Sequence, residues 1–146
     1  GLYGMVIPRF VKQAMTGGPI TMYGTGEQER CFAHVLDVVP ALVRLMDCKQ
    51  ALGQVVNVGN DDMLSIRALA DLVRDLVNPN AQVSFGSYED AYGAGFEDLG
   101  SRQPDLSRMR ELIGFTPARS LEDIIGDVAA NMRSSAAARK TVGEGT

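Results

Sequence analysis

The sequence predicts an α/β fold, because segments with helical spacing of apolar residues alternate with short β-branched runs along the chain. The 146 residues are 45% hydrophobic and 22% charged, which is typical of a globular domain with its own core. No internal repeat is visible, and no low-complexity block precedes the C-terminal tail. One small α/β unit is therefore expected.

The N-terminal part should hold a helix followed by two strands. The helix is expected to begin near Pro8, a residue tolerated in a first helical turn, and to end at Gly17-Gly18. Its apolar residues recur at helical spacing between these two points. The strands are expected over residues 20–23 and 31–35.

The middle of the chain repeats the alternation. Asp37 is a plausible N-cap for a second helix, and residues 54–58 form a β-branched run that predicts a strand. Ser65 should cap a further helix over residues 66–77, in which apolar residues recur at helical spacing. A short strand is expected next, over residues 83–85.

The last third of the chain begins with a long loop over residues 86–104, and a loop of this length inside a small domain is more often functional than idle. Asp105 can cap a short helix that ends at Gly114. Ser120 and Asp123 form a variant of the capping box for the last helix.

The stretch with the most chemical information is residues 23–39, which read YGTGEQERCFAHVLDVV. A strand enters a loop with two glycines, and Arg30 stands where the next apolar run begins. Glycines permit a sharp turn or a close approach of backbone to a ligand, and an arginine offers a planar fork of donors to a phosphate. Taken alone, such a segment is more often a plain hairpin.

This stretch resembles a signature in the C-terminal half of the extended short-chain dehydrogenase/reductase family, written (V/I)YG-x-G-x-Q-x-R-x-F-x-HV-x-DVV-x-A. That family contains the NAD-dependent nucleotide-sugar epimerases, dehydratases and decarboxylases. Further blocks resemble the family in the same order, at residues 4–11, 53–59, 64–70, 102–107 and 113–117. The resemblance covers roughly residues 3 to 128.

The resemblance implies that the chain is the C-terminal fragment of a Rossmann-type enzyme. Residues 1–133 would form the nucleotide-sugar-binding part, a small mixed α/β substrate lobe. Within it, a strand-helix unit over residues 30–48 would pack toward the absent Rossmann domain and leave apolar surface exposed. Residues 134–146 are small and polar and are expected to form a flexible tail.

The two motifs that carry the family's chemistry are missing. No Gly-x-Gly-x-x-Gly turn follows a buried strand, so no NAD is expected to bind this chain alone. The residues four positions after the tyrosines at 3, 23, 88 and 92 are Ile7, Glu27, Tyr92 and Phe96, so no Tyr-x-x-x-Lys pair exists. The chain is therefore expected to be inactive by itself, although NAD serves the full-length family.

The resemblance also implies a nucleotide site. Arg30 and Arg102 would contact the phosphates from opposite sides, and Asp105 would bind the ribose or support an arginine, since a diphosphate suits bidentate cations. The plainer alternative is that both arginines are surface charges and that Asp105 only caps a helix.

Apolar and aromatic residues would line the rest of that site. Tyr23 would line the base or ribose pocket, and Ile7 and Pro8 would form an apolar wall near the base, although core packing explains all three equally well. His34 is the only histidine, and we expect it to be a hydrogen-bonded structural residue because no partner stands at metal-ligand spacing.

Composition limits the partners. A net charge of −4 argues against nucleic acid or an anionic membrane, and no run of about 18 apolar residues predicts a membrane span. Two cysteines make no disulfide framework and favour a reducing, cytoplasmic location. The expected partners are a UDP-sugar, an N-terminal Rossmann half on the same chain or a separate subunit, and a second copy.

The leading hypothesis is the substrate-binding half of a UDP-glucose 4-epimerase-like or UDP-glucuronate decarboxylase-like enzyme. One alternative is a non-catalytic nucleotide-binding module or a subunit of a split enzyme. Another is an association-prone structural fragment without a ligand site.

Overall fold

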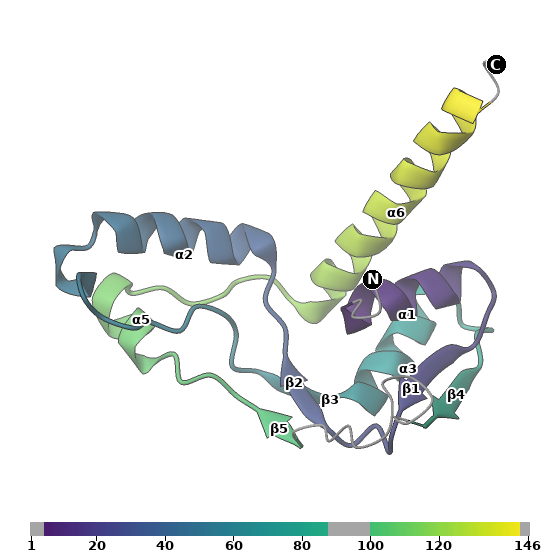
Figure 1. Cartoon of the computed structure of the whole chain (residues 1–146), viewed down its shortest axis with the longest axis horizontal. Coiled ribbons are helices and arrows are strands. Elements are labelled where there is room, and N and C mark those ends of the chain that lie inside the picture. The colour runs from purple at the N-terminus through teal and green to yellow at the C-terminus, as the bar shows by residue number, and fades with distance from the viewer. Residues whose placement is uncertain (1–4, 88–99, 144–146) are drawn as a thin grey trace.

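The computed structural model describes residues 5–87 and 100–143, with side chains up to residue 136. The molecule is elongated (Figure 1). Helices α1 and α3 lie with one small sheet at one end, and α2 and α5 lie at the other end. A second sheet lies between these groups, and α6 projects away from the body. The helices are α1 (Val6–Met15), α2 (Val35–Asp47), α3 (Ile66–Val77), α5 (Ser107–Ile113) and α6 (Leu121–Gly143), with a 3-10 turn at Lys49–Ala51.

The strands form two small sheets. In the first, β1 (Ile20–Tyr23) pairs in parallel with β4 (Val83–Gly86). In the second, β2 (Glu29–Cys31) is central, with β3 (Met63–Ser65) antiparallel on one side and β5 (Ser101–Arg102) parallel on the other. The mixed α/β class predicted from the sequence is confirmed.

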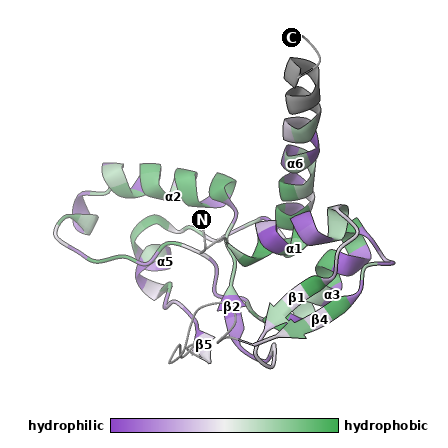
Figure 2. Ribbon diagram, turned by 45° about the vertical axis from the view of Figure 1, so that its right-hand side comes forward, coloured by the Kyte–Doolittle hydropathy of each residue, from purple (hydrophilic) through white to green (hydrophobic). Residues whose placement is uncertain are grey.

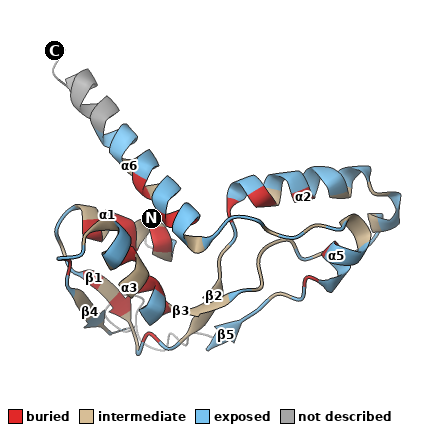
Figure 3. Cartoon of the chain, turned by 180° about the vertical axis from the view of Figure 1, so that it is seen from behind, coloured by how far each residue is buried: buried red, intermediate tan, exposed pale blue. Residues whose placement is uncertain are grey.

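The main core fills the space among α1, β1, α3 and the start of α6. The apolar faces predicted for α1 and α3 are the buried ones, and Phe10 and Leu69 at their centres are fully enclosed. Ser65 caps α3 as predicted, because its Oγ accepts a hydrogen bond from the backbone N–H of Ala68 at 3.1 Å. Buried residues cluster at this end of the molecule (Figure 3).

A second, smaller cluster joins α2 to α5 at the far end. Ala41, Leu106 and Met109 are buried there, with Val58 and Phe115 packed against them. This cluster covers only part of the apolar surface of α2. Along α2, Val39, Val43 and Met46 stay exposed, and Met46 is 85% exposed. The helix is mostly hydrophobic, with a few hydrophilic positions (Figure 2), so it carries the apolar surface expected of a fragment.

Two expected elements near α2 are placed differently by the structure. The strand expected over residues 31–35 begins two residues earlier, at Glu29, and ends at Cys31, where pairing with both neighbouring strands stops. Asp37 is not the N-cap of α2: the helix begins at Val35, and His34 caps it. Asp37 lies inside the first turn.

The strand expected over residues 54–58 is also wrong. These residues pair with no strand in the described part of the chain, and the Val55 side chain is 82% exposed. A β-branched run forms a ladder only where a neighbouring strand is present. Arg108 instead donates a hydrogen bond to the Val55 carbonyl at 2.6 Å.

The last helix begins as predicted. The Ser120 backbone N–H donates to Asp123 Oδ2 at 2.9 Å, and the Asp123 N–H donates to Ser120 Oγ at 3.1 Å, which completes the capping box. α6 then continues as a helix to Gly143, beyond Arg133, where the sequence predicted the end of regular structure. Whether this terminal segment is flexible stays a prediction.

The capping box makes a pH-dependent contribution to stability. Hydrogen bonds from Ser120, and to a smaller extent the charge of Arg119, lower the pKa of Asp123 below its ordinary value. A carboxyl whose pKa is lower in the folded state stabilises it above the unfolded pKa, and this contribution is lost as pH falls through the folded pKa. We expect Asp123→Asn to lower the urea midpoint at pH 7 and to differ less from wild type at pH 3. An equal deficit at both pH values would contradict this linkage.

Candidate functional site

The two arginines predicted to bind phosphate lie side by side. Arg30 in β2 and Arg102 in β5 are register partners in the parallel pair, although they are far apart in the sequence. Register partners on adjacent strands project from the same face of a sheet, so the two guanidinium groups belong to one surface. Two like charges so placed repel each other, and a bound anion would remove this repulsion.

Each arginine has a different environment. Arg30 is half-buried, and its Nη1 donates to the carbonyl of Glu29 at 2.6 Å, with the Gly100 carbonyl at 3.5 Å. Arg102 is exposed on the two-residue edge strand. The Arg102 carbonyl lies 3.7 Å from Cys31 Sγ. Arg30 is therefore held close to the sheet, and Arg102 is the more accessible of the two.

The segment that carries Arg102 is fixed by the loop that precedes β3. Gln103 Nε2 donates to the carbonyl of Asp61 at 2.9 Å, and Asn57 Nδ2 donates to the carbonyl of Asp105 at 3.1 Å. Arg110 Nη2 lies 2.8 and 2.9 Å from the two carboxylate oxygens of Asp61. These contacts hold the edge strand in register with β2, so they support the arginine pair.

Asp105 acts at the start of α5. Its Oδ1 accepts a hydrogen bond from the backbone N–H of Ser107 at 2.9 Å. Hydrogen bonds from Ser107, and then the charges of Arg108 and Arg110, lower the pKa of this carboxyl. The N-cap of α5 is Leu106, so Asp105 stands one residue before the predicted capping position, although its carboxylate still binds the first backbone N–H of the helix. Contact with a ribose stays a prediction.

The glycine loop between β1 and β2 is a tight turn packed against α3. Gly24 and Gly26 have φ angles of 72° and 79°, which disfavour any residue with a Cβ. A Cβ on Gly26 would also lie 3.2 Å from both Arg67 Cβ and Met22 Sδ. Gln28 Nε2 closes the turn by donating to the Tyr23 carbonyl at 3.1 Å. The turn thus fixes the chain between Tyr23 and Arg30.

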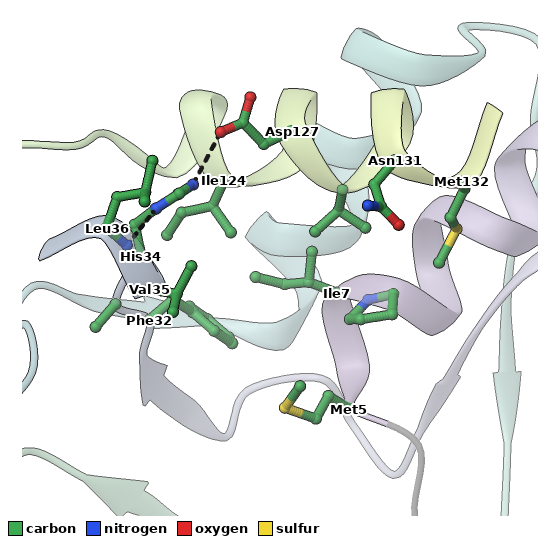
Figure 4. A pocket seen from close by; sticks show the side chains of 13 residues that line it. Met5, Ile7, Phe32, His34, Val35, Leu36, Ile124, Asp127, Asn131 and Met132 are labelled. Atoms are coloured by element: carbon green, nitrogen blue, oxygen red, sulfur yellow. Dashed lines mark hydrogen bonds and ion pairs between the residues drawn. The ribbon is translucent and has the colours of Figure 1, made fainter. Parts of the chain in front are cut away.

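Ile7 and Pro8 lie elsewhere. They line a cavity of about 790 Å³ between the first turn of α1, the β2–α2 junction and α6 (Figure 4). Phe32 and His34 form another part of its wall, whereas neither predicted phosphate-binding arginine belongs to the lining. Its size and mostly apolar lining are those of a small-molecule site. Arg30 and Arg102 thus lie in one sheet, Tyr23 ends β1 in the other sheet, and Asp105 precedes α5. None of these four residues lines the cavity.

His34 connects the two helices beside this cavity. Its Nδ1 accepts a hydrogen bond from the Leu36 backbone N–H at 3.0 Å, and its Nε2 lies 3.0 Å from Asp127 Oδ2. Because Nδ1 accepts, the neutral imidazole must carry its proton on Nε2 and donate it to the carboxylate. The expected structural role of His34 is confirmed. A polar residue directly before an apolar helical run is the sequence signal for an N-cap. We predicted the cap at Asp37, but His34 fits this signal and caps α2.

Removal of the His34 side chain is expected to destabilise the chain by about 2–3 kcal/mol, because it removes an N-cap and a buried hydrogen bond. His34→Asn should lose about half as much, since asparagine caps helices well but cannot reach α6. Asp127→Ala should cost less than either, because the Asp127 side chain is 61% exposed whereas that of His34 is 8% exposed. Urea unfolding measures all three. A His34→Ala variant as stable as wild type would refute the assigned role.

Asp37 is a buried carboxylate with a clear structural task. Its Oδ2 accepts hydrogen bonds from the backbone N–H groups of Ala118 at 3.2 Å and Arg119 at 3.0 Å. It thereby ties the first turn of α2 to the segment that leads into α6. The position of Asp37 inside the apolar run of α2 is the sequence pattern that indicates such a contact.

The described residues supply no metal centre. No group of three His, Cys, Asp or Glu side chains among them could hold a metal ion. The acidic residues at 89, 90, 97 and 98 lie outside the described residues. Burial, and then Asp61, Asp62 and Glu29, raise the pKa of the Cys31 thiol, so it is not an activated nucleophile. Among the described helices, none has the length and apolar character needed to cross a membrane.

Comparison with known proteins identifies the chain. Residues 1–59 match the model of the NAD-dependent epimerase/dehydratase family. A UDP-N-acetyl-alpha-D-glucosaminuronate decarboxylase of Bacillus cytotoxicus is 35% identical over 122 residues, which are 84% of this chain and 38% of that protein. The chain belongs to this family.

Other relatives agree with the assignment. UDP-glucuronic acid decarboxylase 1 of Xenopus tropicalis is 36% identical over 120 residues, 82% of this chain and 27% of that protein. A UDP-glucuronic acid 4-epimerase from Bacillus cereus, solved in complex with UDP-glucuronic acid and NAD, superposes with a TM-score of 0.72 at 22% identity and shares the fold. That match covers 88% of this chain and 40% of the epimerase. This epimerase/dehydratase chain thus spans less than half the length of these relatives and corresponds to their C-terminal part.

Proposed function

We propose that this chain is the nucleotide-sugar-binding part of an NAD-dependent epimerase or decarboxylase and that Arg30 and Arg102 together hold the nucleotide diphosphate. The register pairing of the two arginines carries this proposal. A diphosphate presents several anionic oxygens close together, and two adjacent guanidinium groups can each donate a pair of hydrogen bonds to them. UDP is the proposed nucleotide, because the decarboxylase relatives are named for UDP-sugars.

The chain's contribution to the reaction is positioning. In the proposed full-length enzyme, bound NAD would accept and return a hydride, and the N-terminal Rossmann half would hold it. The residues of this chain do not fit that cofactor, since they include neither the glycine-rich turn nor the Tyr-x-x-x-Lys pair. By holding the diphosphate, Arg30 and Arg102 would fix the sugar relative to the other half.

The exposed face of α2 supports the proposed partner. Val39, Val43 and Met46 recur at helical spacing and lack cover in the described part of the chain. We propose that the N-terminal Rossmann half covers this face in the complete protein. In its absence, a second copy of the chain would cover it. A cytoplasmic location belongs to the same proposal.

Calorimetric titration of UDP tests the nucleotide site. UDP is expected to bind, and UMP is expected to bind at least tenfold more weakly because it lacks one phosphate. ADP, which has the diphosphate but a different base, separates diphosphate binding from base recognition. Equal affinity for UDP and UMP would contradict a diphosphate grip, and no heat with either would remove the proposed function.

A second candidate function follows from the missing motifs. A chain without its own Tyr-x-x-x-Lys pair is a binding module unless another subunit supplies the chemistry. Addition of a separately produced N-terminal half distinguishes the two roles: restored turnover indicates a split enzyme, and UDP binding without turnover indicates a module. Self-association without nucleotide binding would indicate a structural fragment.

A further inference from the structure

We propose that the loop over residues 57–61 is a brace that positions Arg102 for the nucleotide diphosphate, with Asn57 and Gln103 as the positioning residues; this proposal rests on the proposed function. Neither residue is among the six site residues predicted from the sequence. The brace is needed because β5 is a weak element. It has two residues, both are exposed, and among the described strands it pairs only with β2.

Arg102 depends on its backbone for its position. Its side chain is exposed, and its guanidinium group makes no hydrogen bond or ion pair within the described part of the chain. A side chain without a partner of its own reaches a fixed point only if the backbone that carries it is fixed. Ordering a backbone segment costs conformational entropy, so a segment that is already ordered binds its ligand more tightly.

Two hydrogen bonds tie the segment after β5 to the brace. Gln103, which directly follows Arg102, donates from Nε2 to the Asp61 carbonyl at 2.9 Å. Asn57 donates from Nδ2 to the Asp105 carbonyl at 3.1 Å. One bond thus lies at each end of the loop, and the segment that follows Arg102 cannot move independently of it.

The brace is itself anchored on more than one side. The Asp61 carboxylate accepts hydrogen bonds from Arg110 Nη2 of α5 at 2.8 and 2.9 Å, and the Asp61 side chain is 30% exposed. Val56 and Val58, the neighbours of Asn57, pack against the smaller buried cluster between α2 and α5. After residue 62 the chain enters β3, which pairs with β2 on the side opposite β5. The loop therefore links β5 to α5, to the smaller cluster and to the strand on the other side of β2.

The test combines removal of both ties with removal of Arg102. The double variant with Asn57→Ala and Gln103→Ala is expected to weaken UDP binding about tenfold, which is the loss expected for Arg102→Gln alone. Added to Arg102→Gln, the same two substitutions should change UDP affinity by less than about twofold, because a brace that acts through Arg102 then has nothing to position. Gln54→Ala is the matched control, since Gln54 is also exposed and donates to a main-chain carbonyl, that of Gln50 at 2.7 Å.

A second readout follows the edge strand without a ligand. The Glu29 N–H donates to the Gly100 carbonyl at 2.8 Å, so its exchange with solvent reports how often the segment that enters β5 separates from β2. Loss of both ties should speed this exchange about tenfold, while the buried amides of α1 and α3 keep their protection. Gln54→Ala should leave the exchange of Glu29 unchanged.

The outcomes separate the brace from the proposed function. If wild type binds UDP, and loss of both ties leaves either UDP affinity or Glu29 exchange at the wild-type value, the brace is wrong although the phosphate site stands. An equal loss of UDP affinity with and without Arg102 would also overturn the brace, because the ties would then act on the fold as a whole. If wild type does not bind UDP, the proposed function fails, and the brace has no ligand to serve even where exchange shows that the ties hold β5.

Discussion

Replacement of both Arg30 and Arg102 by glutamine is expected to weaken UDP binding about a hundredfold. Each arginine should contribute about 1.4 kcal/mol, which is tenfold, a value at the low end for charged hydrogen bonds because the site faces solvent. The two single variants should therefore lose about tenfold each. Arg102→Gln should reduce the salt dependence more, since Arg102 is exposed whereas Arg30 is half-buried.

Arg133→Gln provides the charge-matched control for these variants. Arg133 is exposed on α6 and belongs to neither β2 nor β5. Its replacement by glutamine removes one positive charge, as each single variant does. Its UDP affinity should stay within twofold of wild type. A double variant that retains wild-type UDP affinity would contradict the arginine site. If Arg133→Gln lost as much UDP affinity as Arg30→Gln or Arg102→Gln, the change in net charge alone would explain the effect.

Replacement of Val39 and Val43 by serine is expected to weaken self-association of the isolated chain about a hundredfold. Both side chains are about half exposed, one helical turn apart on α2. Burial of two valines in an interface contributes about 2–3 kcal/mol after the costs of association. Wild type should therefore sediment as a concentration-dependent dimer, and the double variant as a monomer with less binding of a hydrophobic dye.

Leu76→Ser is the matched control for that experiment. Leu76 is 49% exposed, but it lies on α3 at the other end of the molecule. Its loss should leave sedimentation unchanged. The unfolding midpoint of the double serine variant should also stay close to that of wild type, because the buried residues of α2 are retained. A dimer that survives both valine substitutions would place the interface elsewhere.

Local patterns predicted much of this fold. The apolar spacing of α1 and α3, the cap at Ser65 and the capping box at Ser120 and Asp123 each follow from residues near one another in sequence. These elements pack on the main core, where burial agrees with local preference. The predictions succeeded where both forces act in the same direction.

The failures come from tertiary contacts. His34 rather than Asp37 caps α2, because Asp37 is needed to bind the backbone at 118 and 119 and His34 can reach Asp127. Residues 54–58 form no strand because no partner strand lies beside them in the described chain. A single sequence does not reveal which remote segment will supply a partner.

The candidate site divides in the same way. The resemblance named Arg30 and Arg102, but their adjacency depends on the pairing of β2 with β5, which no local pattern encodes. Ile7 and Pro8 line a cavity that neither arginine lines, and their predicted place beside the base stays a prediction.

The most direct test of the central claim is an NMR titration of the chain with UDP that follows the backbone amides and the arginine Nε–H groups. We expect saturable shifts centred on Arg30 and Arg102 and on the strands that carry them, with smaller effects at Tyr23. Shifts confined to the cavity around Ile7 and Phe32, or none at millimolar UDP in a well-dispersed spectrum, would contradict the claim that the paired arginines hold the nucleotide diphosphate.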